Sequence, residues 1–356
     1  MYLSASQANT FGGCRFSYFC KFGLRLQEQR AAALDKLNTG NFFHAALEAI
    51  VPQGLEESDE VLRARARDFA KNYFAVVDDG KARTKRYFDR LTEKLATLVC
   101  LFRDQLRGSE FRPVEFELTV GQNERVKPMF IPVEDGNVVW IGKVDRVDAY
   151  EKDGKRYLRI IDYKTGNHPF DLKQVYYGTD VQILMYLYTL TCSDGEYKGS
   201  LPAEVLYLKS DTPPVNVLRG KGMEKVIREQ FKNIRPTGLI LEDDDVIKAA
   251  GEGLVPTVAR KINTATLEQF GKLFEYIRSL LADMGKDIRH GRFGKNPLCC
   301  GKDDSPCDFC LINRYCDRER AISCVGRQMT EKPDSESIYG LMEKKMEEAG
   351  KDGVDR

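Results

Sequence analysis

The segment VVWIGKVDRVDAYEKDGKRYLRIIDYK, residues 138–164, decides the fold of this chain. Two runs of strand-forming residues flank Lys152-Asp153-Gly154-Lys155, and Asp-Gly suits the positive φ angles of a two-residue type I′ turn. The segment therefore predicts a β-hairpin. Residues at equal distances from such a turn pair with each other, so Asp145 is expected to face Asp162.

Two carboxylates that face each other across a ladder need a physical reason. With their Cβ atoms about 5 Å apart they repel each other, and a divalent cation between them removes the repulsion. Oxygen ligands of this kind, with water and phosphate completing the shell, favour Mg²⁺ or Mn²⁺ over zinc. Lys143 and Lys164 form the next pair on the same face, where Lys164 can orient a water or offset charge on a phosphate. The alternative, an exposed hairpin with mixed charges, follows if the loop has three residues.

A helical pattern over residues 179–191 follows the hairpin. Gln182 and Tyr186 are spaced i, i+4 and therefore project from one face of this helix. On the spacing alone, ordinary packing is the simpler interpretation, and a place beside the paired carboxylates is the functional alternative.

Composition excludes several classes of protein. Of the 356 residues, 42% are hydrophobic and 31% are charged, which is compatible with a sizeable core. No run approaches the roughly 18 apolar residues of a membrane span, and the N-terminus lacks the pattern of a signal peptide. We therefore expect a cytoplasmic protein without membrane association. The 55 Lys and Arg residues balance 54 Asp and Glu residues, so any nucleic-acid binding must depend on local patches.

The expected fold class is α/β (α+β), with helices flanking a core sheet. Cys100 and Cys192 lie in apolar helical patterns and are expected to be inert core residues. The acidic C-terminal tail predicts a peripheral helix or disorder. The expected parts are a mainly helical part over residues 1–110, a catalytic core over 111–215, a helical part over 216–298 and a cysteine segment over 299–324, all in a single domain ending at 330, and a polar tail over 331–356.

Ten cysteines are many for a protein expected in a reducing compartment, where their spacing indicates metal binding or catalysis before disulfides. Six of them crowd into residues 299–324, and Cys307, Cys310 and Cys316 have the spacing of metal ligands. Thiolates with this spacing suit zinc or an iron-sulfur cluster, and spacing alone favours zinc.

The hairpin motifs resemble those of RecB-type nucleases of the PD-(D/E)XK superfamily. The matching stretches are Gly142-Lys-Val-Asp145-Arg-Val-Asp148, Ile161-Asp162-Tyr163-Lys164-Thr165-Gly166, Gln182-Ile-Leu-Met-Tyr186 and, upstream, Asn41-Phe-Phe-His44. The resemblance implies a restriction-endonuclease-like core sheet. It implies a catalytic Mg²⁺ or Mn²⁺ bound by His44, Asp145, Asp162 and the carbonyl of Tyr163, with Lys164 as the catalytic lysine and Gln182 and Tyr186 lining the DNA strand. Glu117 matches an acidic position on the first core strand, and Asp148 is expected to be structural, paired with Arg146 or a neighbour.

The cysteines narrow this resemblance. Cys307, Cys310 and Cys316, with Cys14 near the other end of the chain, resemble the iron-sulfur nuclease domain of AddB-type subunits of bacterial AddAB helicase-nucleases. The resemblance reverses the preference for zinc, because it implies a 4Fe-4S cluster on these four cysteines that ties the two ends of the domain together. The sequence departs from the family at Arg15, where Pro is usual, at Thr165, where Ser is frequent, and in the additional thiols Cys20, Cys299, Cys300 and Cys324.

The resemblance implies hydrolysis of DNA phosphodiester bonds by a single-strand exonuclease that processes DNA ends in recombinational double-strand break repair. The expected partners are DNA, single-stranded at the site, and an AddA-type helicase-nuclease subunit. The chain has no G-x-x-x-x-G-K-[ST] loop, so we expect an excised nuclease domain or an unusually short relative without a motor of its own. Two alternatives are a free-standing CRISPR-associated type of iron-sulfur exonuclease and a non-catalytic DNA-binding scaffold that keeps the nuclease fold.

Overall fold

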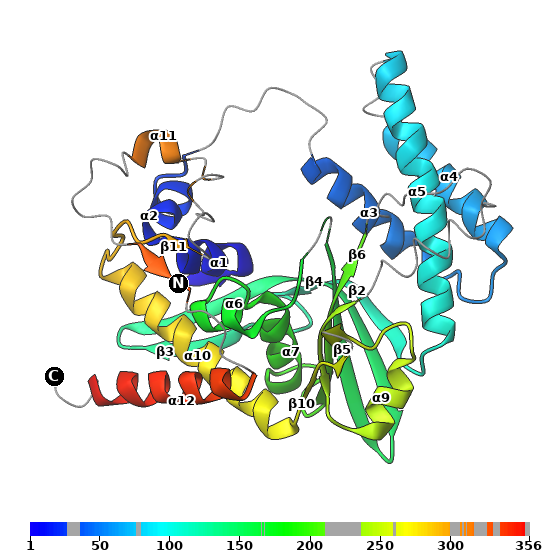
Figure 1. The fold of residues 1–356 in the computed structure, drawn as a ribbon. Coiled ribbons are helices and arrows are strands. Elements are labelled where there is room, and N and C mark those ends of the chain that lie inside the picture. Colours follow the sequence, from blue (N-terminus) through cyan, green and yellow to red (C-terminus); the bar gives the residue numbers. More distant parts are fainter. Residues whose placement is uncertain are drawn as a thin grey trace.

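The hairpin lies at the centre of an eight-stranded mixed sheet in the computed structural model of the chain (Figure 1). The order of strands is β1-β4-β5-β6-β7-β10, and β2 and β3 also pair with β4. The strands are β1 (Tyr2–Ser4), β2 (Arg112–Val120), β3 (Met129–Val133), β4 (Gly136–Lys152), β5 (Lys155–Lys164), β6 (Leu201–Lys209), β7 (Thr237–Leu241) and β10 (Thr264–Ala265). The structure describes residues 1–26, 36–75, 80–164, 166, 168–210, 236–258, 261–299, 307, 310, 312–316, 326–329 and 335–352.

The predicted turn and register of the hairpin are confirmed. Residues pair in the expected register from Lys152–Lys155 to Arg146–Ile161, and the two turn residues Asp153-Gly154 have φ angles of 51° and 72°. Both angles are positive, as a type I′ turn requires. The ladder stops one residue short of Asp145 and Asp162, so these two carboxylates lie directly beyond its last pair.

The expected pairing of Lys143 with Lys164 is wrong. Lys143 pairs with Thr119 of β2, whereas Lys164 pairs with Lys209 of β6 in a parallel ladder. The two strands of the hairpin therefore take different partners past the last common pair. The antiparallel register of the turn does not extend to this end of β5.

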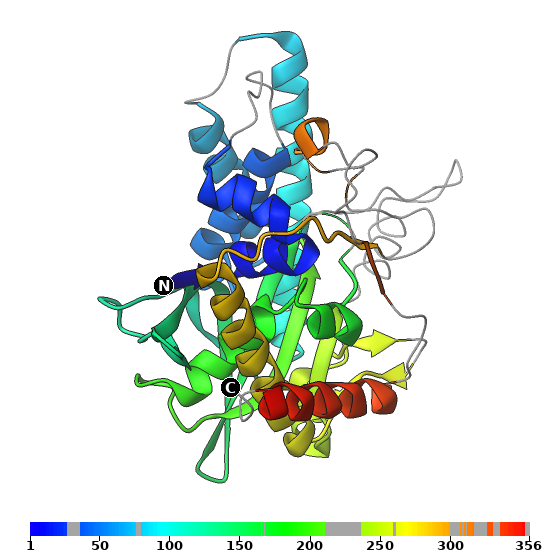
Figure 2. The same cartoon turned by 90° about the vertical axis from the view of Figure 1, so that its left-hand side faces the viewer.

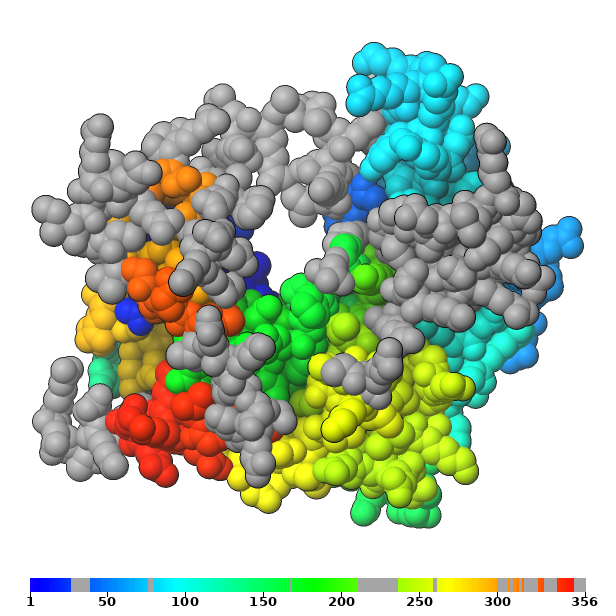
Figure 3. All heavy atoms as spheres, viewed as in Figure 1, coloured from blue at the N-terminus to red at the C-terminus, as the bar shows by residue number. Residues whose placement is uncertain are grey.

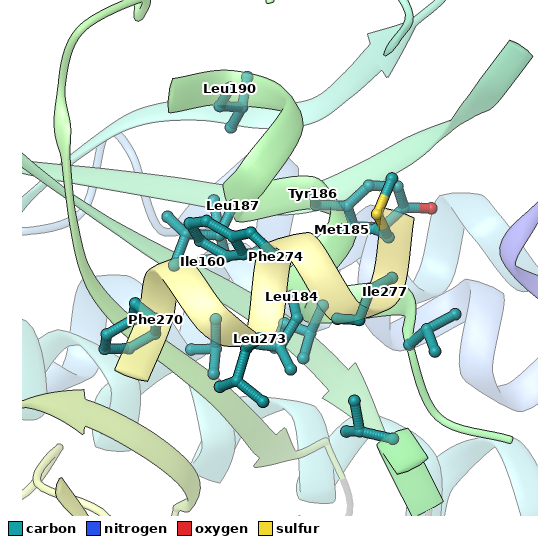
Figure 4. Close-up of a cluster of buried hydrophobic side chains, with 14 of the residues drawn as sticks. Ile160, Leu184, Met185, Tyr186, Leu187, Leu190, Phe270, Leu273, Phe274 and Ile277 are labelled. Carbon is teal, nitrogen blue, oxygen red and sulfur yellow. The ribbon is translucent and has the colours of Figure 1, made fainter. Parts of the chain in front are cut away.

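Helices cover both faces of the sheet (Figure 1). On one face, α7 and α10 enclose a core cluster that includes Ile160, Leu184 and Phe274 (Figure 4). On the other face, α3, α4 and α5 form a second cluster with Ile161 of β5. The predicted fold class is therefore confirmed. The helices are α1 (Ala5–Gly13), α2 (Arg15–Tyr18), η1 (Phe19–Gly23), α3 (Lys36–Ile50), α4 (Asp59–Phe74), α5 (Ala82–Arg107), α6 (Leu172–Tyr177), α7 (Gln182–Cys192), α9 (Asp244–Ala250), α10 (Leu267–Arg289), α11 (Asn313–Cys316) and α12 (Ser335–Asp352).

A buried ionic network crosses the hairpin, and it confirms the structural role predicted for Asp148. Asp148 accepts hydrogen bonds from Arg146 Nε and Nη2, both at 2.6 Å, and from Arg159 Nε at 2.9 Å and Nη2 at 2.6 Å. Arg159 also contacts Glu204 of β6 at 3.4 Å. All four side chains are almost fully buried. Their charges compensate one another, which is the condition for burying them at all.

The structure corrects two expectations about the C-terminal half. Residues 216–298 are not simply helical, because β7 and β10 extend the sheet and the short strands β8 (Thr257–Val258) and β9 (Lys261–Ile262) form a separate hairpin. Short apolar runs such as Thr237–Leu241 fit a strand or a buried helix equally well in sequence. The polar tail contains α12, which is not merely peripheral, because its Ile338 and Met342 are buried in the main core.

Cys100 is buried as expected, but the prediction for Cys192 is wrong, because Cys192 is exposed at the last residue of α7. A cysteine at the end of an apolar helical run has already left the buried stripe. Among the described helices, none combines the length and the apolar character needed to cross a membrane.

The N-terminal helices lie beside the segments that follow α10, and Figures 1 and 2 show this from two sides. The Arg15 backbone N–H donates to Asn296 Oδ1 at 2.9 Å, and its guanidinium pairs with Asp287 at 2.5 Å. Arg327 on β12 (Arg327–Gln328), which pairs with β11 (Leu298–Cys299), donates to the carbonyl of Gly12. Residues about 300 positions apart are thus held together by protein contacts alone.

Candidate metal centre and active site

The site begins at a defect in the sheet. Glu117 of β2 lies opposite Asp145, but no backbone pair is formed there, although the flanking pairs Phe116–Arg146 and Leu118–Val144 are intact. Glu117 has a φ of 50°, which is unusual for a residue other than glycine in a strand. Asp145 is thus unpaired on both sides of β4, and its carboxylate Oδ2 accepts a hydrogen bond from the backbone N–H of Tyr163 at 2.8 Å instead.

His44 on α3 completes a group of three possible metal ligands with Glu117 and Asp145. Its Nδ1 lies 3.5 Å from Asp145 Oδ2 and 3.9 Å from Glu117 Oε1, and one ligand atom from each residue lies within 4.8 Å of the other two. The opposite ring nitrogen, Nε2, is 2.9 Å from the carbonyl oxygen of Tyr163. Burial opposes the charged imidazole, but the hydrogen bond to Asp145, its charge and the Tyr163 carbonyl prevail and raise the pKa of His44.

Asp162 lies behind this group and is only 3% exposed. Its Oδ1 accepts from Gln182 Nε2 at 2.9 Å, and Lys164 Nζ lies 2.7 Å from Oδ2. Burial, followed by the charge of Asp145, raises the pKa of Asp162 to about 7, although Lys164 and His44 act in the opposite direction. Asp162 and Asp145 therefore repel each other, as their register predicts.

Tyr186 reaches the site because Gly142 has no side chain. The Tyr186 hydroxyl accepts from the backbone N–H of Lys143 at 3.3 Å, and a Cβ atom built on Gly142 would lie 2.4 Å from that hydroxyl. Tyr186 is buried against Trp140, with ring centroids 6.3 Å apart. Gln182 and Tyr186 thus both project from α7 toward the sheet, as their i, i+4 spacing predicts.

This donor set suits a hard divalent cation. Three carboxylates and one imidazole converge, and nearby positive charge comes from Lys164 and from Lys143, which pairs with Glu117 Oε2. Carboxylate oxygens with an imidazole nitrogen are appropriate for Mg²⁺ or Mn²⁺. A cation would relieve the repulsion that raises the pKa of Asp162.

A comparison with known families agrees with this arrangement. Residues 2–317 match the model of the PD-(D/E)XK nuclease superfamily. The chain belongs to this superfamily. The match includes the hairpin, α7 and most of the cysteine segment.

Similar proteins within this nuclease superfamily carry one name, the B component of an ATP-dependent helicase/deoxyribonuclease. The chain is 29% identical over 377 residues to the component from Clostridium acetobutylicum, with 98% of this chain and 32% of the relative covered. It is 28% identical to the component from a Thermoanaerobacter species, with the same coverage, and 29% identical to that from Acetivibrio thermocellus, with 97% and 32% covered. The chain spans about a third of the length of these relatives.

A second candidate centre lies where the N-terminal helices meet the cysteine segment. Ser17 Oγ on α2 is 3.9 Å from Cys310 Sγ, and Lys295 donates to the carbonyl of Cys316. Burial raises the pKa of the Cys20 thiol, and the neighbouring charges of Cys310 and Cys14 raise it further. Cys14, Cys20 and Cys310 are therefore neighbours in space although they come from opposite ends of the chain. Cys300 and Cys324 lie outside the described residues, as does Thr165.

Between the cysteine segment and the α3–α5 region, the face in Figure 3 is hollowed, and green atoms from the middle of the chain form its lower border. Asp145, Asp162, Lys164, Gln182 and His44, which the sequence motifs single out, all lie in one region of the structure. Glu117 is matched by the motifs only as an acidic position, and its membership of the closest ligand group depends on its unusual φ. The available signal is an acidic residue within the apolar strand sequence Phe116-Glu117-Leu118.

Proposed function

We propose that this chain is a Mg²⁺- or Mn²⁺-dependent nuclease that cuts single-stranded DNA during the processing of DNA ends. The observation that carries the proposal is the convergence of His44, Glu117 and Asp145 next to the Asp162–Lys164 pair. The superfamily and the names of the helicase/deoxyribonuclease relatives support a DNA substrate.

We assign His44, Glu117, Asp145 and Asp162 to the metal. A divalent cation there would polarise the scissile phosphate and lower the pKa of a water molecule. Lys164 would donate from Nζ to the phosphate or to the attacking water, and its contact with Asp162 holds it in place. Gln182 orients Asp162 through their hydrogen bond, and the Tyr163 carbonyl orients the His44 ring.

The test compares two ion pairs of similar length. Asp162→Ala and Lys164→Ala proteins should bind single-stranded DNA but fail to cut it in Mg²⁺. Lys198→Ala and Asp194→Ala are the controls, because these residues form an exposed pair at 2.6 Å away from the site, and both should cut normally. Cutting by either site variant at the wild-type rate would contradict the assignment.

We also propose that Cys14, Cys307, Cys310 and Cys316 hold a 4Fe-4S cluster. The proximity of Cys14 to Cys310 supports this ligand set, because Cys14 is otherwise remote in sequence. Anaerobically purified protein should be brown and contain about four irons per chain. Colourless protein that contains zinc would refute the cluster while leaving the nuclease proposal intact.

By analogy with the relatives, we propose that an AddA-type helicase-nuclease subunit delivers the strand. Copurification with such a subunit would distinguish this assignment from a free-standing exonuclease. A non-catalytic scaffold is disfavoured, because a scaffold has no use for mutually repelling buried carboxylates.

A further inference from the structure

A second polar cluster lies beside the proposed active site and has no role in the scheme above. Asp180, in the loop between α6 and α7, has only 4% of its side chain exposed. Its Oδ1 accepts from the hydroxyl of Tyr207 at 2.6 Å, and its Oδ2 lies 3.2 Å from Nε2 of His168. A buried carboxylate is costly unless its hydrogen bonds are satisfied, and these two contacts satisfy both oxygens.

The cluster is fixed to the strands that carry the active site. Tyr207 pairs with Asp162 across the β5–β6 ladder. The carbonyl of His168 accepts from Thr237 Oγ1 at 2.8 Å, and Thr237 pairs with Tyr207 across the β6–β7 ladder. His168 is therefore held through both its backbone and its ring, and its position follows from the sheet.

The ring of Tyr207 connects His168 to the catalytic lysine. The His168 ring meets it edge to face with centroids 4.5 Å apart, and Lys164 Nζ lies 5.4 Å from the same centroid. Two nitrogen-bearing side chains thus lie against one aromatic ring at the end of β5. A strand whose scissile phosphate contacts Lys164 would present a neighbouring phosphate to this region.

The His168 ring has a nitrogen available for a ligand. Nε2 is engaged by Asp180, while Nδ1 has no hydrogen-bond partner among the residues that the structure describes, and 35% of the side chain is exposed. In the protonated ring, Nε2–H stays with Asp180 and Nδ1–H can donate to an anionic oxygen. A contact that only joined the loops around α6 would not need an imidazole with an exposed edge.

We infer that His168, oriented by Asp180, binds a backbone phosphate of the DNA strand next to the one that is cut. The ligand class is a phosphodiester anion, and His168 is a substrate-binding residue, whereas Asp180 is a positioning residue. The inference rests on the proposed DNA substrate, and it adds a contact outside the metal centre.

The experiment measures binding of a labelled single-stranded oligonucleotide to the full chain by fluorescence anisotropy in EDTA, so that cutting does not interfere. His168→Ala should weaken binding about tenfold, as expected for the loss of a hydrogen bond to a charged group. The slope of log affinity against log salt should fall by about 0.7, corresponding to one phosphate contact on a single strand. His168→Arg should restore both quantities, because it supplies a cation of similar reach.

A neutral substitution separates charge from structure. His168→Gln can still donate to Asp180 but carries no charge, so it should bind as weakly as His168→Ala. His290→Ala is the matched control, because His290 is exposed at the end of α10 and its ring contacts only the carbonyl of Lys286 among the described residues, and it should bind like wild type. Thermal unfolding of each variant shows whether the fold is kept.

If His168→Gln binds as well as His168→Arg, or if neither His168→Ala nor His168→Gln weakens binding, the inference is wrong. Failure of the proposed function looks different, because the wild-type protein would then neither bind nor cut DNA. Normal cutting by wild type together with unchanged binding by both neutral variants would overturn only the role of His168.

Discussion

Replacement of Asp148 by Asn should unfold the protein far more easily without touching the metal centre. Asp148 accepts four hydrogen bonds from Arg146 and Arg159 at 2.6–2.9 Å and has no exposed surface. The amide is neutral, and its NH₂ group would face guanidinium donors, so two buried cations would lose their main counterion. Breaking a buried ion pair in this way costs about 3–5 kcal/mol.

The assay is chemical denaturation followed by circular dichroism. Asp148→Asn should lower the denaturant midpoint with little change in slope, because the surface exposed on unfolding is nearly the same. Asp194→Asn is the control. It also removes a carboxylate that lies 2.6 Å from a cation, but that pair is exposed to solvent and should contribute nothing measurable. If the two variants lose the same stability, burial does not set the strength of the Asp148 network, and the reasoning is refuted.

Three further predictions concern the site and its support. Gly142→Ala should cost about 1–3 kcal/mol of stability and reduce cutting, because its Cβ would lie 2.4 Å from the Tyr186 hydroxyl; Gly271→Ala, which has open space around it, should do neither. Glu117→Gln should weaken Mn²⁺ binding in calorimetry by at least roughly tenfold, whereas the same change at Glu115, which contacts Tyr197, should not; equal affinities would exclude Glu117 as a ligand. Burial raises the pKa of Glu204 to about 8, so its contribution to stability is lost as pH rises from about 4.5 to 8. Relative to wild type, Glu204→Gln should therefore gain stability over that range, and a constant difference in unfolding free energy would show that Glu204 does not titrate there.

Local rules are sufficient for the hairpin and insufficient for the ligand geometry. Asp153-Gly154 fixes the turn, and the turn fixes which residues of β4 and β5 oppose each other, so the proximity of Asp145 and Asp162 follows from sequence alone. Regular alternation cannot reveal the break at Glu117, because a positive φ at a glutamate depends on the tertiary environment.

The same limit applies to the short strands and to the second polar cluster. The parallel pairing of β10 with β7 joins segments whose local patterns do not specify a partner. His168 and Asp180 are 12 residues apart across a helix, and no spacing rule links them; only the ladder positions of Tyr207 and Thr237 bring them together.

The contacts between the N-terminal helices and the segments after α10 have a consequence for how the chain matures. Arg15 and Cys14 find their partners only after residues 287–310 have been synthesised, when the hairpin and α7 have long since left the ribosome. Contacts of such high sequence separation form slowly, since loop closure must precede them. The metal centre can therefore assemble on a sheet whose N-terminal helices are still unattached, and closure of the molecule is the late step in its biogenesis.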